Sequence, residues 1–200
     1  MSIVDMHVHT EYSPCSRTKV SDLLLKAADL QVGIAITDHD TIKGALKAKE
    51  LSRKYDVKVF VGCEISSREG QILAYGLTEP IPSYLPAELT IDLIHEQGAV
   101  AVAAHPFRTD RESLLEKVYH LPLDGVEVLN LAGGGVSREA ELVAAQRRLA
   151  QTGGSDAHTL QLVGRAGTLF PYQVECEDDI IKAIKKRDCK PVRLWRTTST

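Results

Sequence analysis

The position of its histidines is the feature that most constrains what this chain can fold into. Five of the seven histidines lie in four short clusters, at residues 5–9, 38–40, 104–106 and 155–158. Nearly every cluster stands where a short apolar run meets a turn or loop, and three of the four also carry aspartate. Imidazoles and carboxylates together bind divalent metals. We therefore expect a fold that brings the ends of successive strands to one point.

The rest of the chain alternates short apolar runs with helical segments. Strands are predicted at residues 3–7, 34–37, 57–62, 71–75, 99–103, 125–129, near 153 and at 166–170. Helices are predicted at residues 20–30, 41–55, 87–97, 111–119, 139–150 and 178–187. The run 71–75 is expected to pair with the preceding strand across a turn at 68–70. The alternation otherwise predicts parallel strands, and about seven such units favour an α/β barrel over an open sheet.

Length and composition are those of one globular domain. The chain has 200 residues, of which 44% are hydrophobic, so we expect a single domain over residues 1–200 with a loose tail from about residue 196. The formal net charge is −3, and lysine and arginine form no dense block. We therefore expect no dedicated nucleic-acid surface, although a nucleotide remains open as a substrate.

The sequence is not expected to carry an export or membrane signal. It begins directly with the apolar run 3–7, and no run is long enough to span a bilayer. Cys15, Cys63, Cys176 and Cys189 form no C-x-x-C pair, which argues against a zinc ribbon or a redox motif. These features predict a cytoplasmic protein with reduced thiols and leave its oligomeric state open.

The first cluster alternates acid and imidazole along a strand. Asp5, His7 and His9 are expected to leave on one face, with Met6 and Val8 on the other. Two imidazoles two residues apart can bind one metal ion, and Asp5 can accept a hydrogen bond from one of them. The alternative is a pair of surface histidines beside a structural aspartate.

Acids and histidines recur after later strands. His39 stands between Asp38 and Asp40 directly after a buried run, where unpaired charges would be costly. His105 and the segment 156–158 repeat the arrangement at two more strand ends.

Glu64 ends the apolar run that begins at residue 57 and adds a carboxylate at the same end of the predicted strands as the histidines. Because a carboxylate can bridge two cations, we place Glu64 between two metals; a solvated glutamate after a strand is the alternative. His95, inside a predicted helix, and His120, before a Leu-Pro step, are interpreted as surface or structural residues.

In this order, the motifs resemble those of the PHP (polymerase and histidinol phosphatase) family. The matching stretches are residues 5–10, 36–40, 62–64, 104–106 and 154–158, so the resemblance extends from residue 3 to about residue 170. The resemblance implies a distorted (β/α)7 barrel, similar to a TIM barrel. It also implies a cluster of up to three metals and phosphoesterase chemistry.

The resemblance further implies which residues bind metal. The first ion would be held by His7, His9, Glu64 and Asp156, the second by Glu64 and His105 with help from the strand ending at Asn130, and the third by His39 and His158. Two to three divalent ions per chain, of zinc, manganese or iron, are expected. Asp5 and Asp38 would contact the ligand residues rather than the ions themselves.

The loop after the first strand departs from the family pattern. Many members carry a histidine or aspartate there, whereas this chain has Ser13-Pro14-Cys15. Cys15 could supply a thiolate, a soft ligand that favours zinc; otherwise the third site is weak or empty. The amide of Asn130 could bind metal, substrate or only water, and Glu127 is expected to face the barrel interior.

The expected reaction is hydrolysis of a small phosphate ester. A hydroxide that bridges two cations would attack phosphorus in line. Glu64, Asp156 and His158 are the predicted catalytic residues. Arg108, Arg165 and Asn130 are the predicted substrate-binding residues, because a guanidinium offers paired donors to phosphate.

Two other functions are compatible with the same ligands. An amidohydrolase-like enzyme would cleave a C–N or ester bond, but such enzymes commonly use a bridging lysine where this chain has Glu64. A non-catalytic metal-binding regulatory module ranks last, because degenerate members of the family usually lose several ligands.

Overall fold

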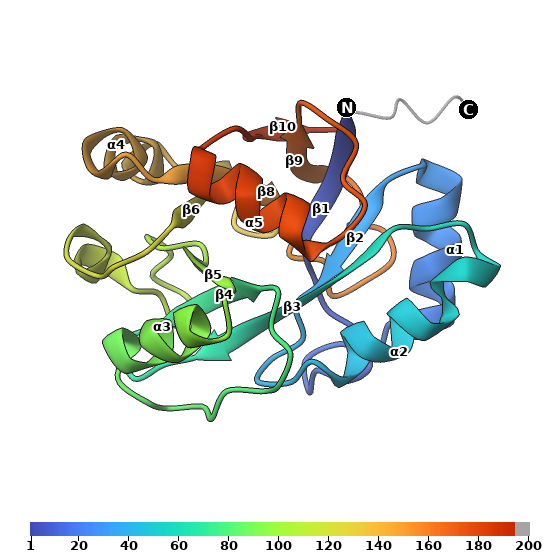
Figure 1. The fold of residues 1–200 in the computed structure, drawn as a ribbon, viewed down its shortest axis with the longest axis horizontal. Helices are drawn as coiled ribbons and strands as arrows, with labels where there is room; N and C mark the ends of the chain where they lie inside the picture. Colours follow the sequence, from blue (N-terminus) through green and yellow to red (C-terminus); the bar gives the residue numbers. More distant parts are fainter. Residues whose placement is uncertain (195–200) are drawn as a thin grey trace.

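A curled, ten-stranded mixed sheet forms the centre of the computed structural model, which describes residues 1–194 (Figure 1). The strands are β1 (Ser2–Val8), β2 (Gly33–Ile36), β3 (Val59–Ser66), β4 (Gln71–Tyr75), β5 (Val100–Ala103), β6 (Gly125–Asn130), β7 (Gly135–Val136), β8 (Ala150–Gly154), β9 (Ala166–Phe170) and β10 (Lys190–Arg193). The helices are α1 (Val20–Leu30), α2 (Lys43–Leu51), α3 (Ala87–Glu96), α4 (Arg138–Arg147) and α5 (Glu177–Lys186), with short 3₁₀ helices η1 (Ser52–Lys54) and η2 (Leu115–Tyr119). The tail predicted from about residue 196 lies outside the described residues.

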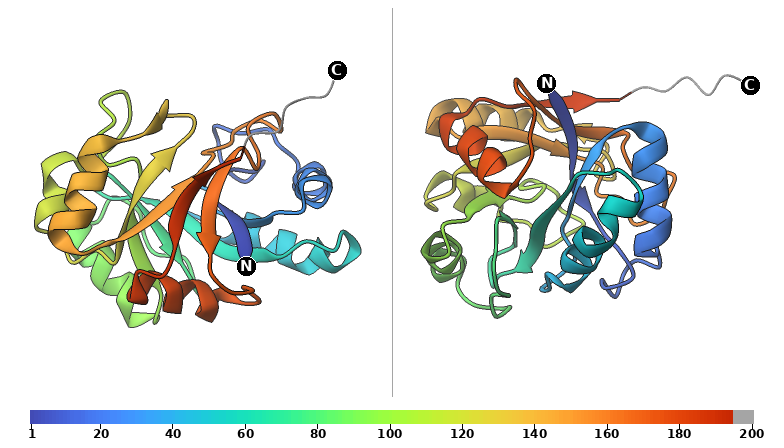
Figure 2. Two further views of the ribbon diagram at one scale, coloured as in Figure 1. Left: turned by 90° about the horizontal axis from the view of Figure 1, so that it is seen from above. Right: turned by 45° about the vertical axis from the view of Figure 1, so that its right-hand side comes forward.

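The strand order is β10-β9-β1-β2-β3-β4-β5-β6-β7, with β8 paired to the other side of β6. An isolated parallel bridge between Val8 and Ala157 brings the end of β8 back to β1, so the sheet curls on itself (Figure 2). The predicted α/β class and the local pairing of β3 with β4 are confirmed. The pairs β3–β4, β4–β5, β1–β9, β9–β10 and β6–β7 are antiparallel, so the chain is not a uniform repeat of parallel β/α units.

Two hydrophobic cores lie on the two faces of this sheet. The outer core packs the apolar faces of α1 to α4 against the strands. The inner core gathers residues of seven strands, among them Val4, Phe60 and Tyr75, around Ile180 and Ile184 of α5. Because Val4 and Val100 stand near the starts of their strands, α5 closes the amino-terminal end of the curled sheet. The carboxyl ends are left for polar side chains.

The first strand carries an irregularity that the sequence did not predict. The register between β1 and β2 shifts between Asp5 and Val8. Met6 packs in the inner core with Val4, whereas Val8 packs in the outer core. The prediction that Met6 and Val8 share a face is therefore wrong, because a bulge rotates the end of the strand relative to its start.

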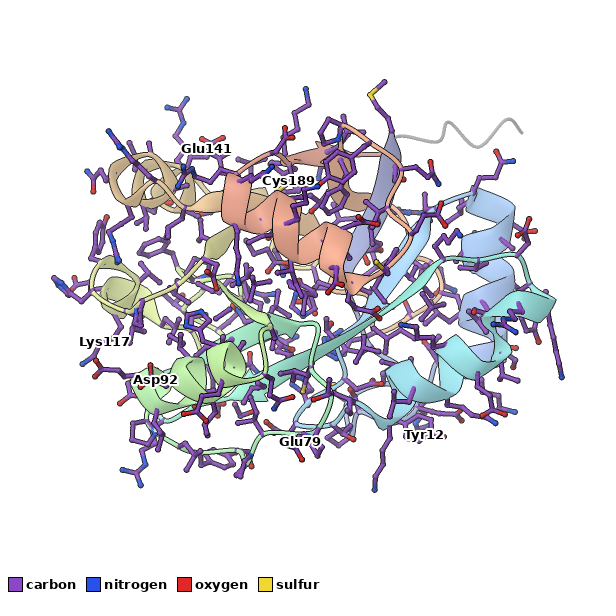
Figure 3. The ribbon with its side chains drawn as sticks, in the orientation of Figure 1. Tyr12, Glu79, Asp92, Lys117, Glu141 and Cys189 are labelled. Carbon is purple, nitrogen blue, oxygen red and sulfur yellow. The ribbon has the colours of Figure 1, made fainter. Side chains whose placement is uncertain are left out.

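Other differences from prediction are local. The helix predicted over residues 111–119 is limited to η2, and the helix predicted to reach residue 150 ends at Arg147, where Arg148 adopts a left-handed cap. The short strands β7 and β10 were not predicted. Charged residues of the helices, such as Asp92, Lys117 and Glu141, point outward (Figure 3). No helix in the described part of the chain has the length and apolar character needed to cross a membrane.

One hydrogen bond crosses the interior of the curled sheet. Tyr75, fully buried on β4, donates its hydroxyl to the backbone oxygen of Met6 on β1, at 2.7 Å. It joins the antiparallel part of the sheet to the strand that carries the first histidines. A buried acceptor that loses its donor keeps its desolvation cost.

We expect Tyr75→Phe to lower the free energy of unfolding by about 1–2 kcal/mol, because the Met6 carbonyl loses this donor. Tyr84→Phe is the matched control, since Tyr84 is 62% exposed. Urea denaturation measures both variants. Equal stability of Tyr75→Phe and wild type would show that the bond contributes nothing.

Candidate metal centre

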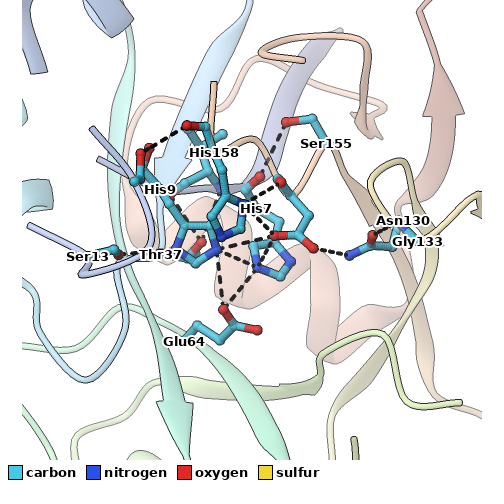
Figure 4. Close-up of polar contacts among 12 residues, drawn as sticks. His7, His9, Ser13, Thr37, Glu64, Asn130, Gly133, Ser155 and His158 are labelled. Atoms are coloured by element: carbon cyan, nitrogen blue, oxygen red, sulfur yellow. Dashed lines mark hydrogen bonds and ion pairs between the residues drawn. The ribbon is translucent and has the colours of Figure 1, made fainter. Parts of the chain in front are cut away.

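The carboxyl ends of the strands bring the predicted ligands into one buried cluster (Figure 4). β1 supplies His7, His9 follows directly after it, β3 supplies Glu64, and the segments after β2, β5 and β8 supply the others. The remaining members of the cluster are His39, His105, Asp156 and His158. Residues from strands far apart in sequence thus meet at one end of the sheet, opposite α5.

The imidazoles of His7 and His9 turn their Nε2 atoms toward each other. The Nδ1 atom of His7 lies 3.0 Å from Oε1 of Glu127, a carboxylate that can only accept. The Nδ1 atom of His9 lies 3.2 Å from Oγ of Ser13, whose own proton goes to Asp38 at 2.7 Å. In its neutral form each ring therefore holds its proton on Nδ1 and presents Nε2 as an acceptor, and the two Nε2 atoms lie 3.1 Å apart.

Carboxylates complete this set of facing acceptors. Oε2 of Glu64 lies 3.3 Å from both Nε2 atoms, and Oδ1 of Asp156 lies 3.5 Å from that of His7 and 3.3 Å from that of His9. Lone pairs at these separations repel one another unless a positive charge stands among them. The arrangement is that of a cation site.

Glu64 joins this set of acceptors to a second one. Its Oε1 atom lies 3.1 Å from Nε2 of His105. Ser113 gives its own proton to the His105 carbonyl at 2.9 Å, so Nδ1 of His105 can donate to the serine oxygen at 3.3 Å. Oε2 of Glu64 thus faces His7 and His9, and Oε1 faces His105.

A third set of possible ligand atoms lies beside the first. His9, Cys15, His39 and His158 bring ligand atoms within 4.8 Å of one another. Nδ1 of His158 donates to the Asp156 carbonyl at 3.0 Å, and its buried Nε2 atom has no hydrogen-bond partner among the described residues. An orphaned, buried nitrogen is costly unless it binds something. Burial raises the pKa of the Cys15 thiol, so a cation would be needed to hold it as thiolate.

The charges of the cluster explain its altered pKa values. Burial opposes a charge on His7, but Glu127, Asp156 and Glu64 raise the pKa of this imidazole well above its usual value. Burial likewise opposes a charge on Glu64, but His7 and His105 lower its pKa well below the ordinary range. The cluster thus has an excess of negative charge that favours a proton or a metal cation.

The backbone is strained where two of these side chains enter the cluster. His105 has a φ of 28° and Asp156 a φ of 52°, in the left-handed region that non-glycine residues seldom adopt. Such strain persists only where the surrounding structure enforces it, and it is common at functional sites.

Glu127 is the central residue of the cluster that sequence reasoning did not assign to the site. It faces the interior of the curled sheet, and there it accepts hydrogen bonds from the ring of His7, the backbone of His105 and the amide of Asn130. The two bonds to Oε2 are each 2.9 Å long. The available signal was an acid within the otherwise apolar run of β6, where an unpaired charge would be unfavourable.

Asp5 does not accept a bond from an imidazole. Its oxygens accept from the backbone and hydroxyl of Ser155, at 2.8 and 2.6 Å, and from the backbone of Gly164 at 2.8 Å. The irregularity in β1 turns Asp5 away from the face that carries His7, and Glu127 takes the predicted role. Burial raises the pKa of Asp5 to about 6. Asp38 acts on His9 through Ser13.

The predicted substrate-binding residues lie at different distances from the cluster. Nη1 of Arg108 lies 3.4 Å from Oδ2 of Asp156, and its other nitrogens pair with Asp110. The amide nitrogen of Asn130 donates to Glu127 and Asp156, while its oxygen accepts from Gly133 at 2.6 Å, which leaves that oxygen less available to a metal. Arg165 is exposed, and no described contact brings its side chain to the cluster.

The cluster fits divalent metal ions. Each set combines imidazole nitrogens with carboxylate or thiol groups, the ligands that zinc, manganese and iron take in proteins. His7, His9 and His105 each have the remote ring nitrogen hydrogen-bonded to Glu127, Ser13 or Ser113, as metal-binding imidazoles usually do.

Comparison with solved structures finds the same fold in hydrolases. A protein of Bifidobacterium adolescentis assigned as a metal-dependent phosphoesterase is 20% identical, with a TM-score of 0.67 over 92% of this chain and 96% of that one. Endonuclease Q, bound to a 27-mer duplex with an abasic lesion at the active site, is 19% identical with a TM-score of 0.70. That match covers 94% of this chain and 58% of the endonuclease.

The endonuclease corrects one expectation. The absence of a dense basic block led us to expect no dedicated nucleic-acid surface, but a protein of this fold binds a DNA duplex. Net charge is a sum over the whole chain, whereas a DNA strand is bound by the local charge of one part of the surface. DNA therefore cannot be set aside as a substrate on the basis of charge.

Sequence comparison identifies the family. A protein of Methanocaldococcus jannaschii whose function is uncharacterized is 39% identical over 138 residues, which are 63% of this chain and 80% of that protein. Residues 137–189 match the family described as PHP-associated. Together with the ligand motifs and the fold, these matches show that the chain belongs to the PHP family.

Proposed function

We propose that this protein hydrolyses a phosphoester with the aid of two to three divalent cations held in the buried cluster. The observation that carries the proposal is the set of imidazole nitrogens and carboxylate oxygens that face one another around His7, His9, Glu64 and Asp156. The fold shared with a phosphoesterase and with an endonuclease supports it, because both cleave phosphoester bonds.

Three groups of residues would hold the ions. The first is His7, His9 and Asp156, the second is His7, Glu64 and His105, and the third is His9, Cys15, His39 and His158. Zinc, manganese or iron suits the imidazole-rich groups, and the thiol of Cys15 favours zinc at the third. Bound there, such ions lower the pKa of water towards neutrality and polarise phosphoryl oxygens.

The protein's own side chains would then position the phosphoester. Arg108 stands at the edge of the cluster, where Nη1 lies 3.4 Å from Asp156 and can donate to a phosphoryl oxygen, while Asp110 keeps the guanidinium oriented. Asn130 holds Asp156 by its amide, and Glu127 fixes the His7 ring. Nε2 of His158, if no ion occupies it, can accept a proton or return one to the departing oxygen.

Metal dependence is the first test. Protein stripped by a chelator should not hydrolyse phosphomonoesters or phosphodiesters, and added manganese or zinc should restore the activity, because removing a catalytic metal removes most of the rate acceleration. A panel of phosphate esters, an abasic DNA duplex and an amide substrate would be assayed against a His7→Ala control. Metal-loaded protein with no phosphoester hydrolysis above that control, or with amide hydrolysis alone, would contradict the proposal.

Glu127 is tested through metal affinity. Glu127→Gln keeps the size of the side chain but removes the charge that holds the His7 ring, so we expect metal affinity to fall about 10–100-fold. Competition with a chelating dye measures it. Glu141→Gln, which removes an exposed charge on α4, should leave the affinity unchanged. Unaltered affinity of Glu127→Gln would show that the carboxylate does not act on the metal ligands.

Arg108 is tested through steady-state kinetics on the ester that the panel identifies. Arg108→Ala should raise KM about tenfold or more with a smaller change in kcat, since the guanidinium binds ground and transition states alike. Arg108→Lys should recover part of the loss. Arg165→Ala provides the comparison between the two predicted arginines. A larger effect at Arg165 than at Arg108 would reverse the assignment that the geometry favours.

A further inference from the structure

A cavity of about 1080 Å³ opens beside the metal centre. His105, Arg108, Glu127 and Asn130 form one end of it, and all four belong to or contact the cluster. Pockets for small molecules usually measure about 300–1,000 Å³, far more than a phosphate group occupies. The cavity therefore has room for a substantial group attached to the phosphate.

The walls of this cavity are largely apolar. Phe107, Leu114 and Tyr119 line one side, from the segment that follows β5, and Val128 and Val136 line the other, on β6 and β7. Aromatic and aliphatic walls with a few polar groups at one end are typical of pockets that bind an organic group.

Some of this apolar surface is exposed without a structural reason. Val136 is 58% exposed and Leu115 is 45% exposed, and both line the cavity. Neither belongs to the inner or the outer core. Exposed apolar side chains that gather in a concave site mark a binding surface more often than scattered ones do.

The charges of the cavity restrict what it can bind. Glu69, Glu116, Glu127 and Glu139 line it together with Arg108 and Lys117, so acids outnumber permanent cations. Two nitrogens of the Arg108 guanidinium are already paired with Asp110. A second phosphate deep in the cavity would meet repulsion and find little to neutralise it.

We propose that this cavity binds the leaving group of the substrate, and that this group is uncharged, mostly apolar and of aromatic size. The phosphate would lie at the shared end, between Arg108 and the metal centre, with the organic group against Phe107, Tyr119 and Val136. The assignment rests on the proposed phosphoesterase function and names the substrate class for the same site: esters of an uncharged aromatic alcohol.

The first measurement separates the cavity from the chemistry. 1-Naphthol, an aromatic alcohol without phosphate, is titrated by fluorescence into metal-stripped protein. Val136→Glu places a charge in the cavity at an exposed position of β7, where folding should be unaffected. We expect it to weaken naphthol binding about tenfold, the usual effect of a misplaced polar group in an apolar pocket. Leu142→Glu, at a 59% exposed position of α4 outside the cavity, should bind naphthol like wild type.

The second measurement compares substrates of the metal-loaded protein. Val136→Glu should lower kcat/KM for 1-naphthyl phosphate about tenfold and leave glycerol phosphate within about twofold, because only the aromatic ester reaches the apolar walls. Naphthol that fails to bind, or equal effects on the two esters, would overturn the assignment. Faster cleavage of an abasic duplex than of any aryl ester would overturn it as well. If naphthol binds as expected but no ester is hydrolysed, the proposed function has failed and the leaving-group role falls with it.

Discussion

The close approach of the His7 and His9 imidazoles is the interaction on which the rest of the site depends. Nε2 of His7 and Nε2 of His9 lie 3.1 Å apart, and the hydrogen bonds at each Nδ1 make both Nε2 atoms acceptors in the neutral rings. Two lone pairs and the Glu64 carboxylate in a buried space are unfavourable unless a cation lies among them. Buried acids, hydrogen-bonded serines and strained backbone hold this arrangement in place.

The fold separates stability from chemistry along the strands. Apolar residues at the strand starts, closed off by α5, form the inner core, while the strand ends deliver ligands to the opposite end. The register shift in β1, between Asp5 and Val8, lies where the chain passes from Met6 in the inner core to His9 in the cluster. Catalytic groups at the carboxyl ends of strands are the general arrangement of barrel enzymes.

Much of the site could be predicted because metal binding requires particular residue types, histidine and the acids, near strand ends. The structure brings together the side chains of five such residues, His7, His9, Glu64, His105 and Asp156. The orientation of Asp5 could not be predicted, because simple alternation fails where β1 shifts register. Glu127 was assigned to the interior without a partner, since only the three-dimensional structure shows that the interior of β6 reaches the back of the His7 ring. The exclusion of nucleic acid failed because it rested on a charge summed over the whole chain.

Anomalous X-ray scattering from crystals grown with manganese or zinc directly tests whether cations occupy the buried cluster. We expect anomalous peaks within bonding distance of the His7 and His9 Nε2 atoms and of Glu64, about 2.0–2.3 Å from their ligand atoms. A further peak beside Cys15 and His158 would mark the third site. Crystals in which His7 and His9 instead share a proton, with no anomalous peak among the cluster residues, would contradict the account.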